Sequence, residues 1–284
     1  MKKEHWSIEI TPRVSLFKLN LKELLDYKDL ILILVKRDFV TTYRQTALGP
    51  LWHLIQPVLT SVTFVIAFSK IAKINIATDV APIVYYMSAI VIWNFFAGIL
   101  SKSSSVFVNN ASVFGKVYFP RLVAPISYII SAIIGFAFQG FFLALIALGT
   151  YVVGNYPLHI SPLLLLTPFI LLALALQGVA MGMIISSVTV RYRDFIYLLT
   201  FGIQLFMYLS PVIYTIQQIQ DPMVKSILML NPVAPFIEMF RYSITGVGEI
   251  STTYITISLA TTFILLFVAI VTFNRTEKTF IDTI

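Results

Sequence analysis

The sequence predicts an all-α polytopic membrane protein with six transmembrane helices. The chain has 284 residues, of which 58% are hydrophobic and only 12% are charged, whereas about 25% of a typical soluble domain is charged. Its mean hydropathy of +0.88 agrees with this shortage of ionic groups. Six apolar stretches approach the roughly 20 residues that a helix needs to cross the hydrocarbon layer. So much apolar surface needs a lipid solvent.

An N-terminal segment, 1–48, precedes the first apolar stretch and is expected to contain an amphipathic interface helix over Leu21–Tyr43. Its apolar residues recur at three- and four-residue spacing on one face, which is typical of a helix lying in the plane of a membrane surface. The helix runs almost directly into the first span through Gly49-Pro50. It is either a membrane anchor alone or a lever for a partner on the inner side, and we favour the lever.

The six spans are expected within a transmembrane domain of residues 49–274, followed by a tail, 275–284. The third and fourth are longer than a crossing requires and are expected to tilt or to extend beyond the bilayer. The six are Leu51–Ser69, Ile83–Leu100, Leu122–Val153, Leu163–Val190, Phe195–Tyr214 and Tyr254–Phe273. A long polar loop, Ser101–Arg121, joins the second span to the third, and its core, Ser105–Lys116, is expected to form a short helix.

The segment Gln217–Gly246 predicts a re-entrant helical hairpin between spans five and six. Prolines interrupt its apolar sequence, and proline stops helices because it lacks a backbone donor. The remaining pieces, Met223–Leu230 and Pro235–Thr245, are each too short to cross a membrane. Glu238 and Arg241, three residues apart, can pair on the second piece, either as a local salt bridge or as part of an outer gate. The candidate gate residues are Pro211, Asn231, Pro232, Glu238 and Arg241.

Basic residues gather on one side of this topology. Of the 20 Lys and Arg residues, 16 lie in the N-terminal segment, the tail and the loops after the second and fourth spans, and 4 lie on the opposite side. Because Lys and Arg are enriched on the cytoplasmic side of membrane proteins, we expect both termini in the cytoplasm and a multi-pass protein of the cytoplasmic (inner) membrane. The same distribution explains the net charge of +7 without a nucleic-acid partner.

The expected spans contain almost no ionisable groups. All 13 acidic residues lie outside them, and His53 is the sole ionisable side chain well inside one. Intramembrane charges usually mark proton or ion pathways, so their absence argues against a proton-driven carrier and less strongly against sodium coupling. The histidines lack metal-ligand spacing, cysteine is absent, and the trace Gly115-Lys116 does not complete the phosphate-binding loop GxxxxGK[ST]. We therefore expect no metal, no cofactor and no enzymatic activity in this chain.

Aromatic residues make up 14% of the chain. Most are expected in the belts at the two membrane interfaces. An interior subset could line a conduit for sugars, since sugar rings stack on aromatic faces and tyrosine hydroxyls bond to sugar hydroxyls. The candidate channel aromatics are Tyr43, Trp52, Trp93, Tyr208 and Tyr214.

Three segments stand in register with this topology: Arg37–Trp52 (RDFVTTYRQTALGPLW), Lys116–Arg121 (KVYFPR) and Asn231–Pro235 (NPVAP). Together they resemble the ABC transporter type 2 permeases, and more specifically the branch that exports lipid-linked polysaccharides such as O-antigen, capsule and teichoic acid. The resemblance covers nearly the whole chain. It implies a homodimer of six-span subunits in contact with membrane lipids, with two copies of a cytoplasmic ABC ATPase that binds ATP and Mg²⁺. It also implies a channel between the protomers and a substrate that is a glycan on an undecaprenyl-type lipid.

The resemblance also implies roles for particular residues. The interface helix and the loop helix would dock the ATPase, through Glu23, Asp26, Asn109, Asn110 and Lys116. Guanidinium groups bind phosphate through paired N–H bonds, so the pyrophosphate head group would meet arginines at the cytoplasmic entrance. The candidates are Arg37, Arg44, Arg191 and Arg193. Alternatively, these arginines only enforce the topology.

The predicted function is that of the transmembrane permease subunit of an ATP-driven exporter of lipid-linked polysaccharide, with O-antigen favoured. The first alternative is an ABC permease of the same fold that exports a small molecule, drug or lipid. A membrane enzyme would need clustered acidic or histidine residues at one membrane face, and the sequence offers none. A passive channel or structural anchor would show no dependence on an ATPase.

Overall fold

A computed structural model describes residues 24, 26–44, 46, 48–74, 79–114, 119–192 and 194–280, and all regular structure in these ranges is helical. Five helical stretches are long and apolar enough to cross a membrane: Trp52–Ile71, Pro82–Ser104, Val123–Gly154, Pro162–Thr189 and Thr252–Thr276. A shorter apolar helix, α9 (Phe195–Tyr208), and one bent helix pair accompany them. The predicted all-α polytopic fold is therefore confirmed.

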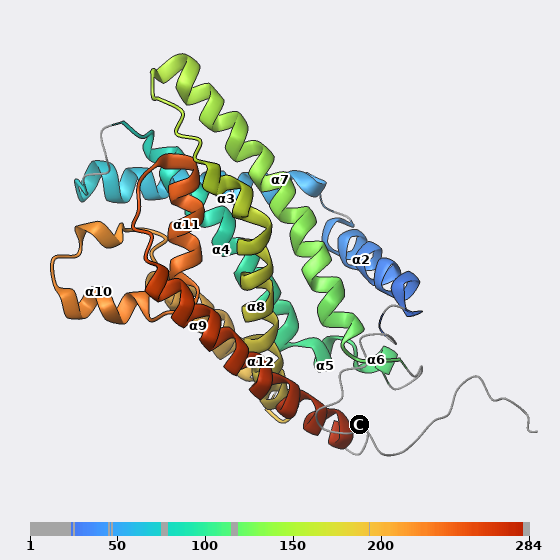
Figure 1. The fold of residues 1–284 in the computed structure, drawn as a ribbon. Coiled ribbons are helices and arrows are strands. Elements are labelled where there is room, and N and C mark those ends of the chain that lie inside the picture. Colours follow the sequence, from blue (N-terminus) through green and yellow to red (C-terminus); the bar gives the residue numbers. More distant parts are fainter. Residues whose placement is uncertain are drawn as a thin grey trace, which may run out of the picture.

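Helix α4 (Pro82–Ser104) forms the centre of the bundle and is buried along most of its length. It packs against α7 (Val123–Gly154) and α8 (Thr167–Thr189), and α12 (Thr252–Phe280) packs against α8 (Figure 1). A helix that is apolar all round is typically surrounded by other helices, which is the position that α4 occupies. The other spans expose broad apolar faces, as a lipid solvent requires.

Two glycines allow α8 to approach α4 closely. A Cβ atom at Gly182 would lie 2.4 Å from the Cβ of Ser103 and 3.0 Å from the carbonyl oxygen of Leu100. At Gly178 it would lie 3.0 Å from the Cγ2 of Ile99. Small residues let the backbones of membrane helices come together. The GxxxG sequence of α8 is therefore a packing contact within the chain.

The fifth predicted span, Phe195–Tyr214, is wrong over its last six residues, 209–214. Helix α9 ends at Tyr208 and has 14 residues, which extend about 21 Å at the α-helical rise and fall short of a hydrocarbon layer of about 30 Å. The chain turns after Ser210, because Pro211 has no N–H group to continue the helix. The carbonyl groups of Pro211 and Tyr214 instead accept hydrogen bonds from Arg241. A side chain distant in sequence thus captures backbone that hydropathy alone assigned to the helix.

The predicted hairpin is present and consists of α10 (Pro222–Met229) and α11 (Ala234–Thr245), bent by 96° at the break between them. Asp221 caps α10 by accepting a hydrogen bond from the backbone N–H of Met223 at 2.8 Å. Helix α11 ends at Gly246, whose φ of 68° is left-handed and suits glycine. The hairpin lies away from the short loop helices α5 (Val106–Asn109) and α6 (Ala111–Phe114), near which α12 ends (Figure 1).

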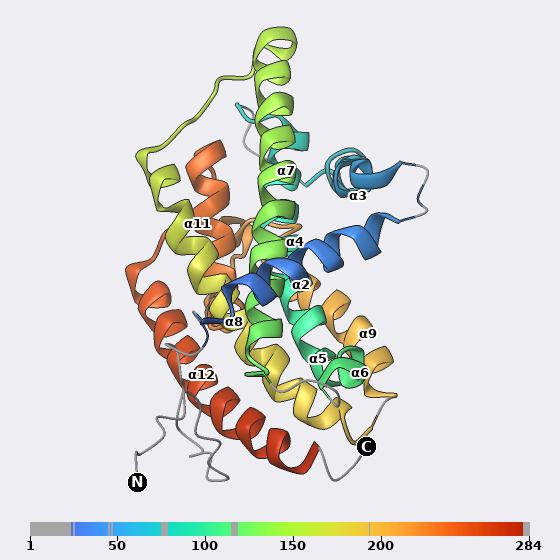
Figure 2. The same ribbon diagram turned by 90° about the vertical axis from the view of Figure 1, so that its right-hand side faces the viewer.

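Helix α2 (Lys28–Tyr43) is the described part of the expected interface helix, and residues 1–23 and 25 lie outside the description. It crosses α7 obliquely in Figure 2. Ile31 and Val35 are buried in a cluster that includes Val123 at the start of α7. Leu32, which the three- and four-residue spacing also assigns to the expected apolar face, is exposed, because a 3.6-residue period carries it away from α7.

Candidate functional site

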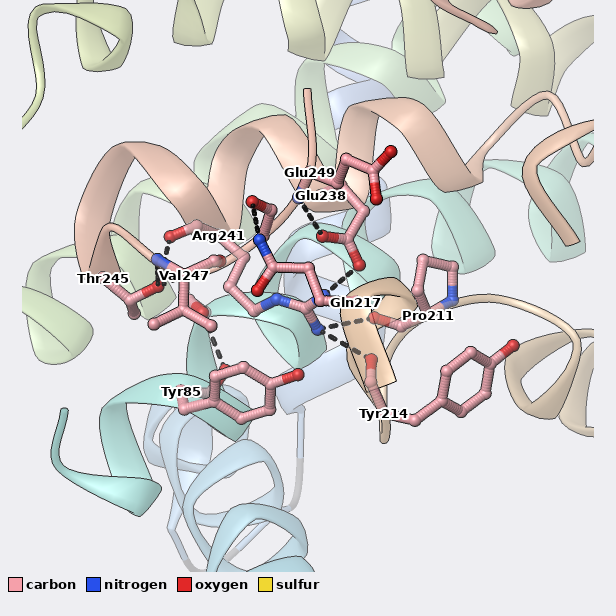
Figure 3. A network of polar contacts seen from close by, with 11 residues as sticks. Tyr85, Pro211, Tyr214, Gln217, Glu238, Arg241, Thr245, Val247 and Glu249 are labelled. Atoms are coloured by element: carbon pink, nitrogen blue, oxygen red, sulfur yellow. Dashed lines mark hydrogen bonds and ion pairs between the residues drawn. The ribbon is translucent and has the colours of Figure 1, made fainter. Parts of the chain in front are cut away.

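Two charged side chains of α11 are completely buried at the hairpin (Figure 3). Arg241 donates from Nη2 to Oε1 of Glu238, so the pair predicted from their spacing exists. Taking two charges out of water costs several kcal/mol for each ion, and good geometry with further hydrogen bonds is needed to offset that cost. The remaining polar atoms of the pair therefore need hydrogen-bond partners of their own.

Arg241 also binds the chain that follows α9. Its Nη1 atom donates to the carbonyl oxygens of Pro211 at 2.7 Å and Tyr214 at 3.3 Å, while its Nε has no hydrogen-bond partner. The guanidinium carbon lies 4.6 Å from the centroid of the Tyr85 ring on α4, where a cation is attracted by the ring. One side chain thus joins α11, α4 and the turn after α9 (Figure 3).

Glu238 binds the segment that leads into α12. Its Oε2 atom accepts a hydrogen bond from the backbone N–H of Glu249 at 3.2 Å. The neighbouring Gly248 has a φ of 146°, and a Cβ there would lie 2.7 Å from that same Oε2, so glycine is needed for this approach. Gln217 donates to the carbonyl of Gly248 at 2.8 Å, and the carboxylate of Glu249 pairs with Lys225 of α10 at 2.5 Å. We call this set of contacts around Glu238 and Arg241 the hairpin clamp.

The elbow of the hairpin is held by Gln177 of α8. Its Nε2 atom lies 3.0 Å from the carbonyl oxygen of Pro232, 3.1 Å from the hydroxyl of Ser258 and 2.9 Å from that of Thr262. Ser258 also donates to the Pro232 carbonyl. Because Gln177, Ser258 and Thr262 are all buried, these contacts tie the elbow firmly to α8 and α12.

The structure brings the five predicted gate residues together around the hairpin. Asn231 donates to the hydroxyl of Ser210 at 2.9 Å, beside the elbow proline, and the other four belong to the clamp or the elbow. Sequence reasoning missed Tyr85, Gln177, Gln217 and Gly248. Only Gln177 carried a signal, as an amide in an otherwise apolar span. Whether the hairpin gates a passage stays a prediction.

A second polar node joins α2, α5 and α7. Arg37 donates to Oδ1 of Asn110 at 2.8 Å, and Nδ2 of Asn110 donates to the hydroxyl of Tyr128 at 2.8 Å and to the carbonyl of Val106 at 2.9 Å. Asn110 is only 2% exposed. It therefore lies inside the protein, with its amide used in internal contacts, and does not belong to an open docking surface as expected. It links the interface helix to the loop helix.

Asn110→Leu is expected to lower the free energy of unfolding by about 1–3 kcal/mol, because Arg37 and Tyr128 lose a buried partner. Thermal unfolding of the detergent-purified chain measures the change. The matched control is Asn109→Leu, one position earlier and exposed, for which we expect a change within about 0.5 kcal/mol. Equal losses in the two variants would show that the node adds no stability.

The other docking and head-group candidates are partly described. Asp26 and Asn109 are exposed, as docking requires, whereas Glu23, Lys116 and Arg193 lie outside the described residues. Arg37 is engaged with Asn110. Arg44 and Arg191 are exposed, and the Arg191 guanidinium lies 5.7 Å from the ring centroid of Tyr192. Arg44 and Arg191 are thus the head-group candidates that present open side chains.

The predicted channel aromatics do not form one group. Trp93 is 4% exposed and packs against Phe96 and Phe206 at centroid distances of 5.6 and 5.7 Å, so it lies in the core of the chain and faces no open passage in this conformation. Trp52 and Tyr208 are each 48% exposed. Tyr214 is half-buried beside the clamp, and the side chain of Tyr43 lies outside the description.

The fold and the clamp define a multi-pass helical membrane protein with a polar, ion-paired hairpin. Within the described ranges, no three His, Cys, Asp or Glu residues gather as a metal site. The chain belongs to the ABC-2 type transporter family, whose model matches residues 29–245. It is thus the transmembrane component of a transporter that works with an ATPase.

Curated relatives match most of the chain. An O-antigen export system permease protein RfbA of Klebsiella pneumoniae is 26% identical over 254 residues, covering 89% of this chain and 94% of that protein. The protein of the same description from Myxococcus xanthus is 25% identical over 222 residues, covering 78% of this chain and 82% of its own length. The family expected from the three sequence segments is therefore confirmed.

Proposed function

We propose that this chain is the permease subunit of an ATP-driven exporter that moves a lipid-linked polysaccharide, with O-antigen favoured, across the cytoplasmic membrane. The observation that carries the proposal is the long match to O-antigen export permeases, which covers 89% of this chain and 94% of the Klebsiella pneumoniae protein. Hydrolysis of ATP with Mg²⁺ would take place in a partner ATPase. Both termini would face the cytoplasm, as the distribution of basic residues favours.

The surface of α9 supports a passage shared by two copies of the chain. No residue of α9 is buried within the protomer. Four of its five large exposed hydrophobic side chains recur every three or four residues, at Tyr197, Phe201, Leu205 and Tyr208, and so share one face, with Leu198 beside them. An uncharged aromatic face suits a glycan, because weak and repeated stacking holds a polymer without trapping it. The second copy would cover the remainder of this face.

The hairpin clamp and the Arg37 node suggest how ATP binding in the partner could move the hairpin. Two ATPase chains would dock at the α5–α6 end, near the exposed side chains of Asp26 and Asn109. The Arg37–Asn110–Tyr128 contacts would transmit their movement from α2 and α5 to α7. The hairpin clamp would make α10 and α11 move together as the outer gate.

Arg44 and Arg191 are proposed to bind the pyrophosphate head group at the entrance. A hydrogen bond to a charged group is worth about 1.5–3 kcal/mol, so Arg44→Ala and Arg191→Ala should each reduce export roughly 10-fold or more while leaving assembly intact. The assay is ATP-dependent transfer of lipid-linked glycan into proteoliposomes that contain the chain and its partner ATPase. The control is Lys70→Ala, since Lys70 is an exposed basic residue in the last turn of the first span.

The same assay tests both layers of the proposal. Parental export rates in both arginine variants would refute the head-group role and leave topology as the reason for these residues. Absence of ATP-dependent glycan transfer by the parent chain, with the assembled ATPase active, would refute the export function itself.

A further inference from the structure

A polar crevice of about 140 Å³ lies within the protomer between α2, α3 (Trp52–Phe64), α4 and α7. Besides Tyr128, its polar lining consists of Asp38, His53, Asn94, Lys102, Ser131 and Gln139. Polar and ionisable groups inside a membrane bundle are costly and usually functional. Tyr128 already belongs to the Arg37 node, whereas neither that node nor the hairpin clamp accounts for the other six.

The charges of the crevice cancel. Asp38 and Lys102 are the lining side chains that carry a fixed charge, one negative and one positive, and Lys102 donates to the Asp38 carboxylate at 2.6 Å. A phosphate group entering here would have to compete with Asp38 for Lys102 and would face a like charge. The pair therefore favours an uncharged ligand that can both donate and accept hydrogen bonds.

The deeper groups match such a ligand. Asn94 approaches Gln139 at 3.4 Å, which is long for a hydrogen bond. Each amide offers two donors and two acceptor lone pairs, so most of their capacity is open to a ligand. The hydroxyl of Ser131 is buried without a hydrogen-bond partner. An unpaired buried hydroxyl costs about 1–3 kcal/mol, which a ligand hydroxyl would recover.

The size and apolar walls indicate a single ring. An engineered cavity of about 150 Å³ in another protein holds one benzene molecule, and this crevice has a similar volume, about 140 Å³. Phe95 and Phe136 belong to its wall and pack edge to face, with ring centroids 5.9 Å apart. A pyranose ring combines C–H faces for such walls with hydroxyls for the carboxylate, amine and amide groups.

We propose that this crevice binds one uncharged sugar ring within each protomer, separately from any passage between two copies. The ring hydroxyls would bridge the Asp38–Lys102 pair at one end and the Asn94–Gln139 pair at the other. Lys102 lies in the last turn of α4, beside α5, so the site sits in the half of the bundle where cargo would enter. Treating the ring as part of the exported glycan rests on the proposed function, whereas binding of a free sugar does not.

The chain contains no cysteine, so an introduced one is a unique probe. Gly98 lines the crevice, and a Cβ there meets nothing within 4 Å. Gly98→Cys in the complex with its ATPase would be treated with N-ethylmaleimide, with and without N-acetylglucosamine or methyl mannoside. We expect either sugar to slow the modification about threefold at twice its dissociation constant, since protection follows 1 + [L]/Kd. Inorganic pyrophosphate should not protect.

The matched control is Gly149→Cys, near the other end of α7, where a Cβ is equally unhindered. Its modification should not respond to sugar. Adding Gln139→Leu to Gly98→Cys should abolish protection without changing the rate in the absence of sugar. Ligand-observed NMR on the unmodified chain, with Gln139→Leu as comparison, gives the same answer should Gly98→Cys fail to fold.

A modification rate of Gly98→Cys that is the same with and without sugar would show that the crevice holds water only. Protection by pyrophosphate but not by sugar would make it a phosphate site. Equal protection at Gly149→Cys would make the effect non-specific. Each result overturns the proposal. If the chain exports glycan with ATP but its crevice shows no sugar protection, the crevice site alone is refuted. If sugar protects the crevice but the chain exports no glycan, the proposed function alone is refuted.

Discussion

Glu238→Leu is expected to destabilise the protein by about 3–5 kcal/mol, because it leaves Arg241 charged and fully buried without its carboxylate. The backbone N–H of Glu249 also loses its acceptor. The segment that leads into α12 should then detach from the hairpin. Thermal unfolding and the yield of monodisperse protein in detergent measure the loss.

The double variant Glu238→Leu/Arg241→Met separates the charges from the shape of the site. Replacing a buried ion pair by apolar side chains is often neutral or stabilising. Here the carbonyls of Pro211 and Tyr214 lose their donor as well, at about 1–3 kcal/mol. We therefore expect the double variant to be more stable than Glu238→Leu alone and less stable than the parent. A double variant that is the least stable of the three would contradict this account of the clamp.

Gly182→Leu is expected to lower the free energy of unfolding by at least about 3 kcal/mol, at or beyond the usual cost of overpacking. Its Cβ alone would meet Ser103 at 2.4 Å and the Leu100 carbonyl oxygen at 3.0 Å, and a backbone cannot yield as a flexible side chain does. Helix α8 would have to withdraw from α4. The bond at 2.7 Å from the hydroxyl of Thr189 to the carbonyl of Ser104, in the same contact, would then lengthen.

Gly149→Leu is the matched control for that substitution. A Cβ at Gly149 meets nothing within 4 Å, so this variant should stay within about 0.5 kcal/mol of the parent. Both variants add the same side chain to a membrane helix. A similar loss of thermal stability in the two would mean that the α4–α8 contact is less tight than the structure indicates.

The elements that local sequence determines were predictable. The α10–α11 hairpin follows from prolines placed between short apolar pieces, and the pairing of Glu238 with Arg241 follows from their three-residue spacing. Helix α9 was predicted too long, because apolar residues continue to Tyr214 while the backbone turns to serve Arg241. A hydropathy profile does not register such a competition for carbonyl groups.

The sites depended on contacts between distant segments. Asn110 looks like a surface residue of a polar loop, yet its amide lies between Arg37 and Tyr128. Trp93 looks like an interfacial or conduit aromatic, yet α4 runs through the centre of the bundle and buries it. Gly98, Asn94 and Gln139 meet at one crevice because α4 and α7 pack side by side. None of these positions follows from a residue type or its near neighbours.

The sequence by itself determined that the chain is a helical membrane protein, where its crossings begin, where its hairpin breaks and which family it belongs to. In lipid these features depend on the local sequence, because each backbone polar group must be hydrogen-bonded within its own helix and each crossing needs its own apolar length. Beyond the Glu238–Arg241 pair, the tertiary structure alone decided which polar groups meet in the clamp, the node and the crevice. In lipid, helices associate through close packing and polar contacts rather than through hydrophobic burial. The partners of Gln177 or Arg241 are therefore set by how the helices fit together, which hydropathy along the chain does not record.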